Sequence, residues 1–153
     1  MAVGGAAALS RRWGRLGAGT LDVATRYAYT LVPLGFGMWL AHYWFHFLTS
    51  YDTIVPVAQR FAADFGMTLL GEPEWVRGCC LPMTEWLLPL EMLFLDLGLL
   101  LSLYTGYRLA LAEASRPALA LKALAPWALL MVLLFATGIW ILVQPMQMRG
   151  TVL

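Results

Sequence analysis

Charged residues are scarce in this sequence: Asp, Glu, Lys and Arg make up 12% of its 153 residues, while 61% are hydrophobic. A soluble domain would carry about 25% charged residues. The ten basic and nine acidic residues give a formal net charge of +1, and they form no long run of one sign. The composition therefore excludes an ordinary soluble domain, and it offers no basic surface for nucleic acid.

Histidine and cysteine are also scarce, with two of each. The motifs CxxC, CxxCH, HExxH, GxSxG and the Walker phosphate loop are all missing. These motifs supply the nucleophiles, metal ligands and phosphate cradles of many enzymes. Independent catalysis therefore lacks its usual apparatus, and we expect none.

Long apolar segments are what the sequence has in abundance. Three of them reach the roughly 20 residues that a helix needs to cross about 30 Å of hydrocarbon: residues 27–49, 86–107 and 124–143. None alternates with the period of two that marks a barrel strand. The sequence predicts an all-α integral membrane protein with three transmembrane helices. Residues 1–25 would form a flexible cytoplasmic leader and residues 26–153 the membrane domain.

Basic residues are distributed unevenly around the three segments. Seven of the ten either precede the first segment or lie between the second and the third. The positive-inside rule then places the N-terminus in the cytoplasm, and three spans place the C-terminus on the other side. We expect a multi-pass membrane protein with a cytoplasmic N-terminus and a C-terminus on the outer side, surrounded by lipid and by other membrane subunits.

The external loop, residues 50–85, is long enough to contain a helix of its own. Apolar side chains recur there at every fourth position: Val57, Phe61, Phe65 and Leu69. This pattern predicts a short amphipathic helix that ends near Gly66 and lies on the outer membrane surface or against the spans.

The two cysteines, Cys79 and Cys80, are adjacent in the same loop. Adjacent thiolates do not form the usual metal-binding pair, which needs two or more residues between them. Because no third cysteine exists, the hypothesis for an oxidising face is a vicinal or intermolecular disulfide. The alternative is that one of them packs as a small hydrophobic residue.

Both histidines lie near the outer end of the first segment, in the string HYWFHF. Four residues apart on a helix, His42 and His46 share one face. Three roles stay open: an interfacial aromatic belt, contact with a quinol or redox partner, and a metal site. Imidazole and thioether both bind copper, so the metal alternative adds Met146 and Met148, which follow the third segment on the same side.

The second segment contains two carboxylates, Glu91 and Asp96. A central Asp costs about 2.5 to 3.5 kcal/mol on insertion, and intramembrane carboxylates are functional candidates by default. Five residues apart, they point about 140° away from each other on a helix, so one is expected to face the chain's own bundle and the other a partner. Glu91 lies at the depth of His42, and this pair could accept a proton from a quinol. For each carboxylate, the alternative is a purely structural polar contact.

The strings HYWFHF, LLPLEMLFLDLGLLLSLYTGYR and QPMQMRG resemble the membrane C-terminal part of polytopic bacterial iron-sulfur electron-transfer proteins of the NosR and NapH type. The resemblance extends over the chain from about residue 27. It implies electron transfer from quinol. It also implies that the membrane is the bacterial inner (cytoplasmic) membrane, so that the outer side, with the C-terminus, is the periplasm. The cluster-binding run CxxCxxCxxxCP is missing, so an iron-sulfur cluster or a haem would belong to a partner subunit.

These observations predict an auxiliary membrane subunit of a bacterial respiratory or related redox complex. It would anchor its partners and contribute to an outer-side quinol or electron-carrier site. The alternatives are an outer-face Cu(I) binding or delivery protein and a purely structural assembly subunit.

Overall fold

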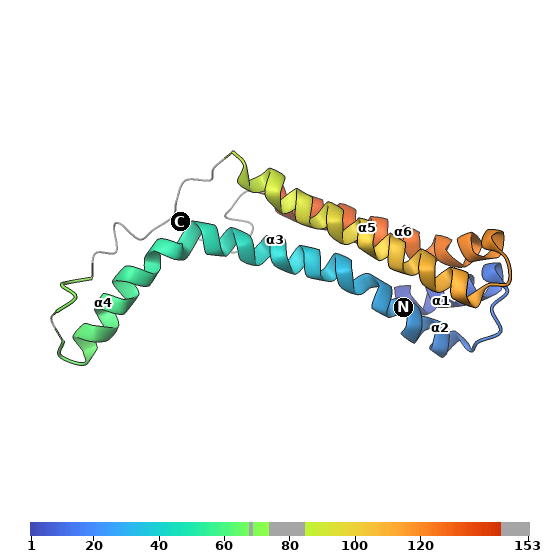
Figure 1. Ribbon diagram of the computed structural model, residues 1–153, viewed down its shortest axis with the longest axis horizontal. Helices are drawn as coiled ribbons and strands as arrows, with labels where there is room; N and C mark the ends of the chain where they lie inside the picture. Colours follow the sequence, from blue (N-terminus) through green and yellow to red (C-terminus); the bar gives the residue numbers. More distant parts are fainter. Residues whose placement is uncertain (68, 74–84, 145–153) are drawn as a thin grey trace.

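The computed structural model describes residues 1–67, 69–73 and 85–144, and these residues form helices joined by short connections. This agrees with the predicted all-α class, and no strand occurs in those residues. The elements in chain order are α1 (Ala2–Gly14), α2 (Thr20–Ala28), the 3-10 turn η1 (Tyr29–Leu31), α3 (Val32–Ser50), the 3-10 turn η2 (Tyr51–Thr53), α4 (Ile54–Asp64), α5 (Leu87–Glu113) and α6 (Pro117–Leu142) (Figure 1).

The three longest helices, α3, α5 and α6, run along the long axis of the molecule (Figure 1). α5 packs against both of the others, whereas α3 and α6 touch each other at only a few points. α1, α2 and the connection between α5 and α6 lie at one end, and α4 lies at the other (Figure 1). α5 is therefore the helix that holds α3 and α6 together.

Glycine lets α3 and α5 approach closely. A Cβ atom on Gly37 would lie 2.5 Å from a backbone carbonyl oxygen of α5, and one on Gly98 would lie 2.9 Å from a backbone carbonyl oxygen of α3. The same interface contains a buried hydrogen bond of 2.9 Å, which the Leu34 N–H donates to the Ser102 hydroxyl. Small residues at a helix crossing are typical of packing inside membranes, where close contact replaces the hydrophobic effect.

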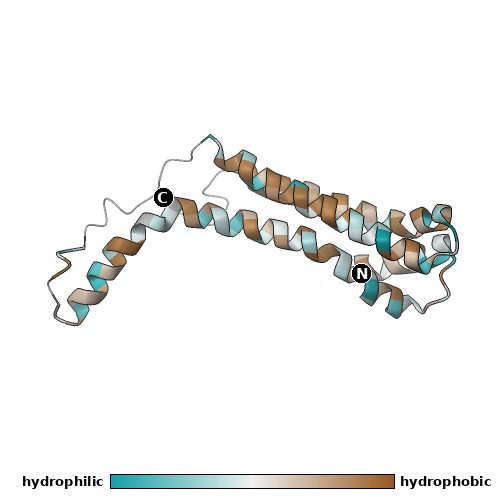
Figure 2. Cartoon of the chain, viewed as in Figure 1, coloured by the Kyte–Doolittle hydropathy of each residue, from teal (hydrophilic) through white to brown (hydrophobic). Residues whose placement is uncertain are grey.

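Two helices of the described part, α5 and α6, are long and apolar enough to cross a membrane, and Figure 2 shows both as mostly hydrophobic. Only 28% and 33% of the residues in their most apolar stretches are buried within the chain. The core helix of a soluble protein would bury most of them, so these helices need lipid or other subunits as cover. α3 has no charged residue but is not among these two helices, because Trp, Tyr and His in its second half lower its mean hydropathy.

The N-terminal segment differs from the prediction of a flexible leader, because residues 1–25 form α1 and much of α2. The Ser10 hydroxyl donates a buried hydrogen bond of 2.6 Å to the Ala123 carbonyl oxygen of α6. A Cβ atom on Gly14 would lie only 2.5 Å from the Ala123 Cβ. Small side chains thus allow α1 to pack directly on α6.

α2 completes the core at this end of the molecule. The ring of Tyr27 stacks on that of Trp127 with 5.5 Å between centroids, and both side chains are fully buried. Arg26 forms an ion pair with Glu113 at 3.1 Å, which joins α2 to the last turn of α5. These contacts fix the direction in which the chain enters α3.

At the opposite end, α4 forms where a short helix was predicted, and Gly66 follows it with φ of 73°. That left-handed conformation commonly follows the end of a helix. α4 contacts mainly the η2 turn rather than the long helices. Phe61 and Phe65 are exposed on it, and its location on a membrane surface stays a prediction.

Candidate functional site

α5 carries a carboxylate on its buried face. The buried residues of this helix recur every three or four positions, and Glu91 lies on that stripe between Leu87 and Leu95. Its side chain is 0% exposed. An apolar residue is the usual occupant of such a position. A carboxylate there is costly unless it is hydrogen-bonded or protonated, and this cost makes Glu91 a functional candidate.

The two histidines face the same region from α3. Their imidazole rings lie edge to face with 4.6 Å between centroids, as expected for residues four apart on one helix face. His46 is half-buried and His42 is exposed. The buried Phe45 packs edge-on against the His46 ring, with 5.3 Å between centroids. These contacts restrict the orientations open to His46.

Glu91 and both histidines line one small pocket of about 70 Å³ between α3, α5 and α6. The complete lining is Met38, His42, Phe45, His46, Glu91, Ile141 and Leu142. A pocket of this size has room for a few water molecules or for the polar edge of a ring. Imidazole and carboxylate groups can bind a hydroxyl group and take up its proton. The pocket can therefore support acid–base chemistry on a small polar group.

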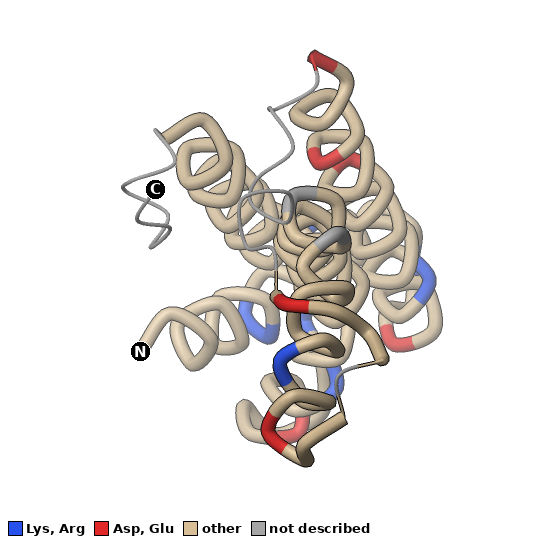
Figure 3. Tube along the Cα trace, turned by 90° about the vertical axis from the view of Figure 1, so that its left-hand side faces the viewer, with Lys and Arg blue, Asp and Glu red and all other residues tan. Residues whose placement is uncertain are grey.

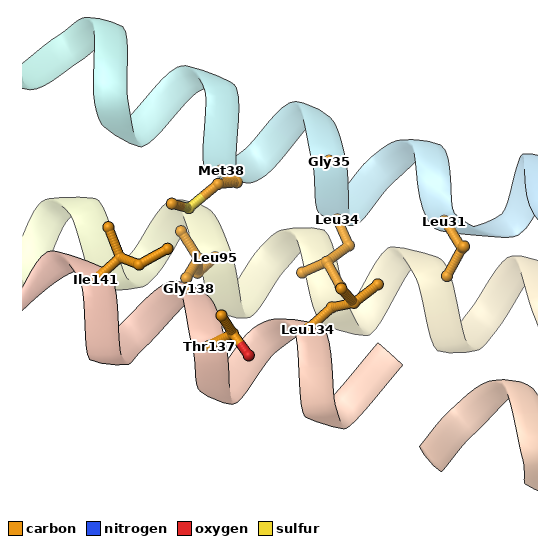
Figure 4. Close-up of a pocket in the computed structure, with 9 residues that line it drawn as sticks. All are labelled: Leu31, Leu34, Gly35, Met38, Leu95, Leu134, Thr137, Gly138 and Ile141. Carbon is orange, nitrogen blue, oxygen red and sulfur yellow. The ribbon is translucent and has the colours of Figure 1, made fainter. Parts of the chain in front are cut away.

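A larger apolar groove of about 340 Å³ adjoins this pocket, and the two share Met38 and Ile141. The groove lies between α3 and α6 and is also lined by Leu95 of α5 (Figure 4). Its complete lining is Leu31, Leu34, Gly35, Met38, Leu95, Leu134, Thr137, Gly138 and Ile141. The one hydroxyl in this lining, on Thr137, donates to the Leu133 carbonyl oxygen at 2.8 Å. The groove is thus an apolar channel that leads to a polar end.

Two glycines shape the groove in different ways. A Cβ atom on Gly35 would meet nothing within 4 Å, so this residue leaves the α3 wall open. A Cβ atom on Gly138 would lie 2.8 Å from the Leu95 side chain, so this residue lets α6 approach α5. The sequence prediction included neither the groove nor Met38 and Ile141 at its junction with the pocket.

The second carboxylate, Asp96, lies outside this site. Its residue is exposed, as expected from the 140° between the two carboxylates, and it forms no ion pair with any residue that the structure describes. Exposed leucines flank it on α5, among them Leu93, Leu97 and Leu100. Asp96 therefore points away from the chain's own core.

The copper alternative adds Met146 and Met148 to the histidines, and both methionines lie outside the described residues. The same is true of Cys79 and Cys80, the candidates for a disulfide. Within residues 1–67, 69–73 and 85–144, no group of three or more His, Cys, Asp or Glu is arranged to hold a metal ion. Among the described residues, therefore, no third His, Cys, Asp or Glu is arranged to bind a metal ion together with His42 and His46.

Comparisons of the chain with protein-family models, curated proteins and solved structures found no match. The arguments about function therefore depend on the residues of this chain.

Proposed function

We propose that this protein is an auxiliary integral membrane subunit of a bacterial redox complex, and that the groove between α3 and α6 binds a quinol. One observation carries the proposal: a fully buried carboxylate, Glu91, lies with two histidines at the polar end of an apolar groove. Isoprenoid quinols have the same polarity, with an apolar tail attached to a ring that bears two hydroxyl groups.

The proposal includes α3 as a third membrane span. Its 19 residues contain no Asp, Glu, Lys or Arg, and at 1.5 Å per residue they extend about 28 Å, close to the hydrocarbon thickness. The residues that α3 exposes are largely aromatic, among them Phe36, Trp39, Tyr43 and Phe47. Aromatic side chains are favoured at membrane interfaces, so this surface suits a lipid or protein contact.

The distribution of charge supports a pocket on the outer side. The described part contains eight basic residues. Seven of them lie in or next to α1, α2, the last turns of α5 or the first turns of α6, and the exception is Arg60. These segments gather at one end of the molecule (Figure 1). The positive-inside rule assigns that end to the cytoplasm. The histidines near the other end of α3 would then face the periplasm.

The proposed reaction is the two-electron oxidation of a quinol to a quinone. The quinol loses two protons and two electrons. We assign proton uptake to the imidazole of His42 or His46 and to the Glu91 carboxylate, from which the protons pass to the outer aqueous phase. The electrons pass to an iron-sulfur cluster or a haem held by a partner subunit. The pocket residues bind, orient and deprotonate the quinol.

The proposed partner contact includes the exposed face of α5. An ionisable residue in a span is costly when it faces lipid, and such residues usually face protein or water. Asp96 is exposed among leucines, so a second membrane subunit would give this carboxylate a polar neighbour. The structural-subunit alternative shares this contact but needs no chemistry at Glu91.

The first test is purification in mild detergent from native membranes, followed by identification of the accompanying subunits and metal analysis. We expect subunits that carry clusters or haem, and no copper bound to this chain. An isolated chain with one equivalent of copper, lost in His46→Ala, would instead support the Cu(I) alternative.

The second test addresses the groove with a photoreactive quinone analogue that carries an isoprenoid tail. We expect labelling of α3 and α6 near Met38 and Ile141, and loss of labelling in Gly35→Leu, whose side chain would fill the groove. The matched control is Gly4→Leu, where a Cβ atom also meets nothing within 4 Å but lies outside the groove. Equal labelling of both variants would contradict a quinol site in the groove.

A further inference from the structure

α1 and the first half of α6 form a second composite surface, at the basic end of the molecule. One part is a hollow of about 570 Å³, lined by Arg12, Trp13, Arg15, Leu119, Lys122 and Ala125. The other is an apolar groove of about 330 Å³ whose lining includes Gly5, Leu9, Trp13, Ala125, Leu129 and Leu133. The two parts share Trp13 and Ala125. A cationic opening thus adjoins an apolar groove.

The cationic part has three positive charges without a matching negative charge. Arg12 and Arg15 come from the C-terminal end of α1, which begins at the N label in Figure 3, and Lys122 comes from α6. None of the three forms an ion pair with a residue that the structure describes. Like charges repel one another, so this arrangement is stabilised by an anion.

The apolar part has the length of one lipid chain. Leu133 lies eleven residues beyond Lys122 in α6, which is about 16 Å along a helix. Half of the hydrocarbon thickness of a bilayer is about 15 Å. Leu129 and Leu133 are both more than half exposed in this chain alone. The surface therefore changes from cationic to apolar over the distance that separates a lipid headgroup from the bilayer centre.

We propose that this surface is a binding site for an anionic phospholipid. The phosphodiester lies against Arg12, Arg15 and Lys122, and one acyl chain lies in the groove between α1 and α6. Trp13 is located at the boundary of the two parts, where tryptophan is favoured in membrane proteins. Basic pockets between helices on the cytoplasmic side are known to suit such headgroups. The site requires that α6 lies in a bilayer, but it is independent of the quinol pocket.

Docking of α1 on α6 builds this site. The Ser10 hydrogen bond to the Ala123 carbonyl oxygen and the close approach at Gly14 place α1 against α6. Without that contact, the arginines of α1 and Lys122 of α6 would not line one hollow. A lipid with one phosphate and one apolar chain bridges the same two helices, so its binding is expected to stabilise α1 on α6.

The test is native mass spectrometry of the full chain in neutral detergent, titrated with dioleoyl phosphatidylglycerol or with dioleoyl phosphatidylcholine. We expect saturable binding of the anionic lipid, at least tenfold tighter than that of the zwitterionic one. Each cation removed should weaken binding about fivefold, so Arg12→Gln/Arg15→Gln should weaken it about 25-fold. The matched control is Arg11→Gln on the same helix, because Arg11 donates to the Thr20 hydroxyl and does not line the hollow.

A second pair of variants tests the apolar groove without altering charge. Gly5 lines the groove and Gly4 does not, and a Cβ atom on either meets nothing within 4 Å. Gly5→Leu should weaken lipid binding severalfold, whereas Gly4→Leu should leave it unchanged. If the double arginine variant fails to fold, this pair still tests whether an acyl chain binds in the groove.

Three results would overturn the proposal. The first is equal binding of both lipids. The second is an equal loss in Arg11→Gln and in a single Arg12→Gln variant, which would indicate general attraction to a basic surface. The third is full competition by inorganic phosphate at the concentration of the lipid, which would indicate a site for free phosphate without an acyl chain.

Discussion

At the scale of single residues, Glu91 is the position where chemistry and packing conflict. The buried face of α5 places a side chain there that is completely enclosed. A leucine would satisfy the helix pattern without the cost of removing a carboxylate from water. Natural proteins retain such costly groups mainly at functional sites.

This conflict predicts opposite effects on stability and on activity. Glu91→Leu should leave the Tm of the purified protein unchanged or raise it, because leucine is buried without the cost of removing a carboxylate from water. The exposed His42 and the half-buried His46 can bind water in place of the carboxylate. Quinol oxidation by the assembled complex should fall by about 100-fold or more, which is the usual contribution of a general base. Thermal unfolding and quinol-dependent reduction of an acceptor measure the two effects.

Glu91→Gln serves as the control, because it keeps the shape and polarity of the side chain but cannot accept the proton. It should lose activity to a similar degree. A Tm that falls by many degrees in Glu91→Leu, with activity retained in Glu91→Gln, would instead assign the carboxylate a structural role.

The sequence indicated the residues of this site but not its shape. His42 and Glu91 were expected at one depth, and the structure has both in the lining of one pocket. The adjoining groove depends on α3 and α6 both packing on α5 while hardly touching each other. No local pattern in one helix encodes that arrangement, because it results from the relative positions of three helices.

At the scale of helices, small residues decide which surfaces meet. Gly37 lies so near the Phe94 carbonyl oxygen that a Cβ atom would approach it to 2.5 Å. Gly35, two residues earlier, faces open space. The same helix therefore contains one glycine that packing requires and another that it does not.

Alanine substitution should separate the two glycines. Gly37→Ala should destabilise the α3–α5 interface by about 1 to 3 kcal/mol, because a backbone carbonyl cannot move aside without shifting its helix. Gly35→Ala should be neutral or slightly stabilising, since alanine is the better helix former. Thermal unfolding in detergent measures both, and an equal loss in the two variants would contradict the close crossing of α3 and α5.

Helices with a long apolar run were predictable from sequence, whereas the N-terminal helices were not. The predicted segments 86–107 and 124–143 correspond to α5 and α6, although both helices extend further at the ends that meet in the connection between them. Residues 1–25 were interpreted as a flexible leader because they contain no long uninterrupted apolar run. The signal for α1 was the spacing of Ala6, Ser10 and Gly14, which places small residues on one face every four positions.

At the scale of the whole molecule, the two ends differ in chemistry. One end gathers α1, α2 and most of the basic residues, and the other carries the histidine pocket and α4. This polarity suits a protein that lies across a membrane, with anionic lipid at one face and a redox partner at the other. This placement of the two ends on opposite sides of a membrane requires that α3 is a span. If only α5 and α6 crossed, the chain would return to the side from which it started.

Site-directed labelling can decide whether α3 crosses the membrane. In a variant without native thiols, Cys79→Ser/Cys80→Ser, a single cysteine is introduced either at Gly17, between α1 and α2, or at Glu72, both exposed. If α3 spans the bilayer, the two positions lie on opposite sides. A membrane-impermeant maleimide applied to intact cells with a permeable outer membrane should then label Glu72→Cys but not Gly17→Cys until the inner membrane is disrupted.

Labelling of both positions from the same side would show that α3 lies along the membrane and that only α5 and α6 cross it. The histidines would then lie beside the headgroups instead of near the outer end of a span. The apolar groove would lose its lipid surroundings, and a quinol tail would have no access to it from the bilayer. The same experiment therefore tests the topology and the physical basis of the proposed quinol site, since a groove for an isoprenoid chain requires both of its walls, α3 and α6, to lie within the hydrocarbon.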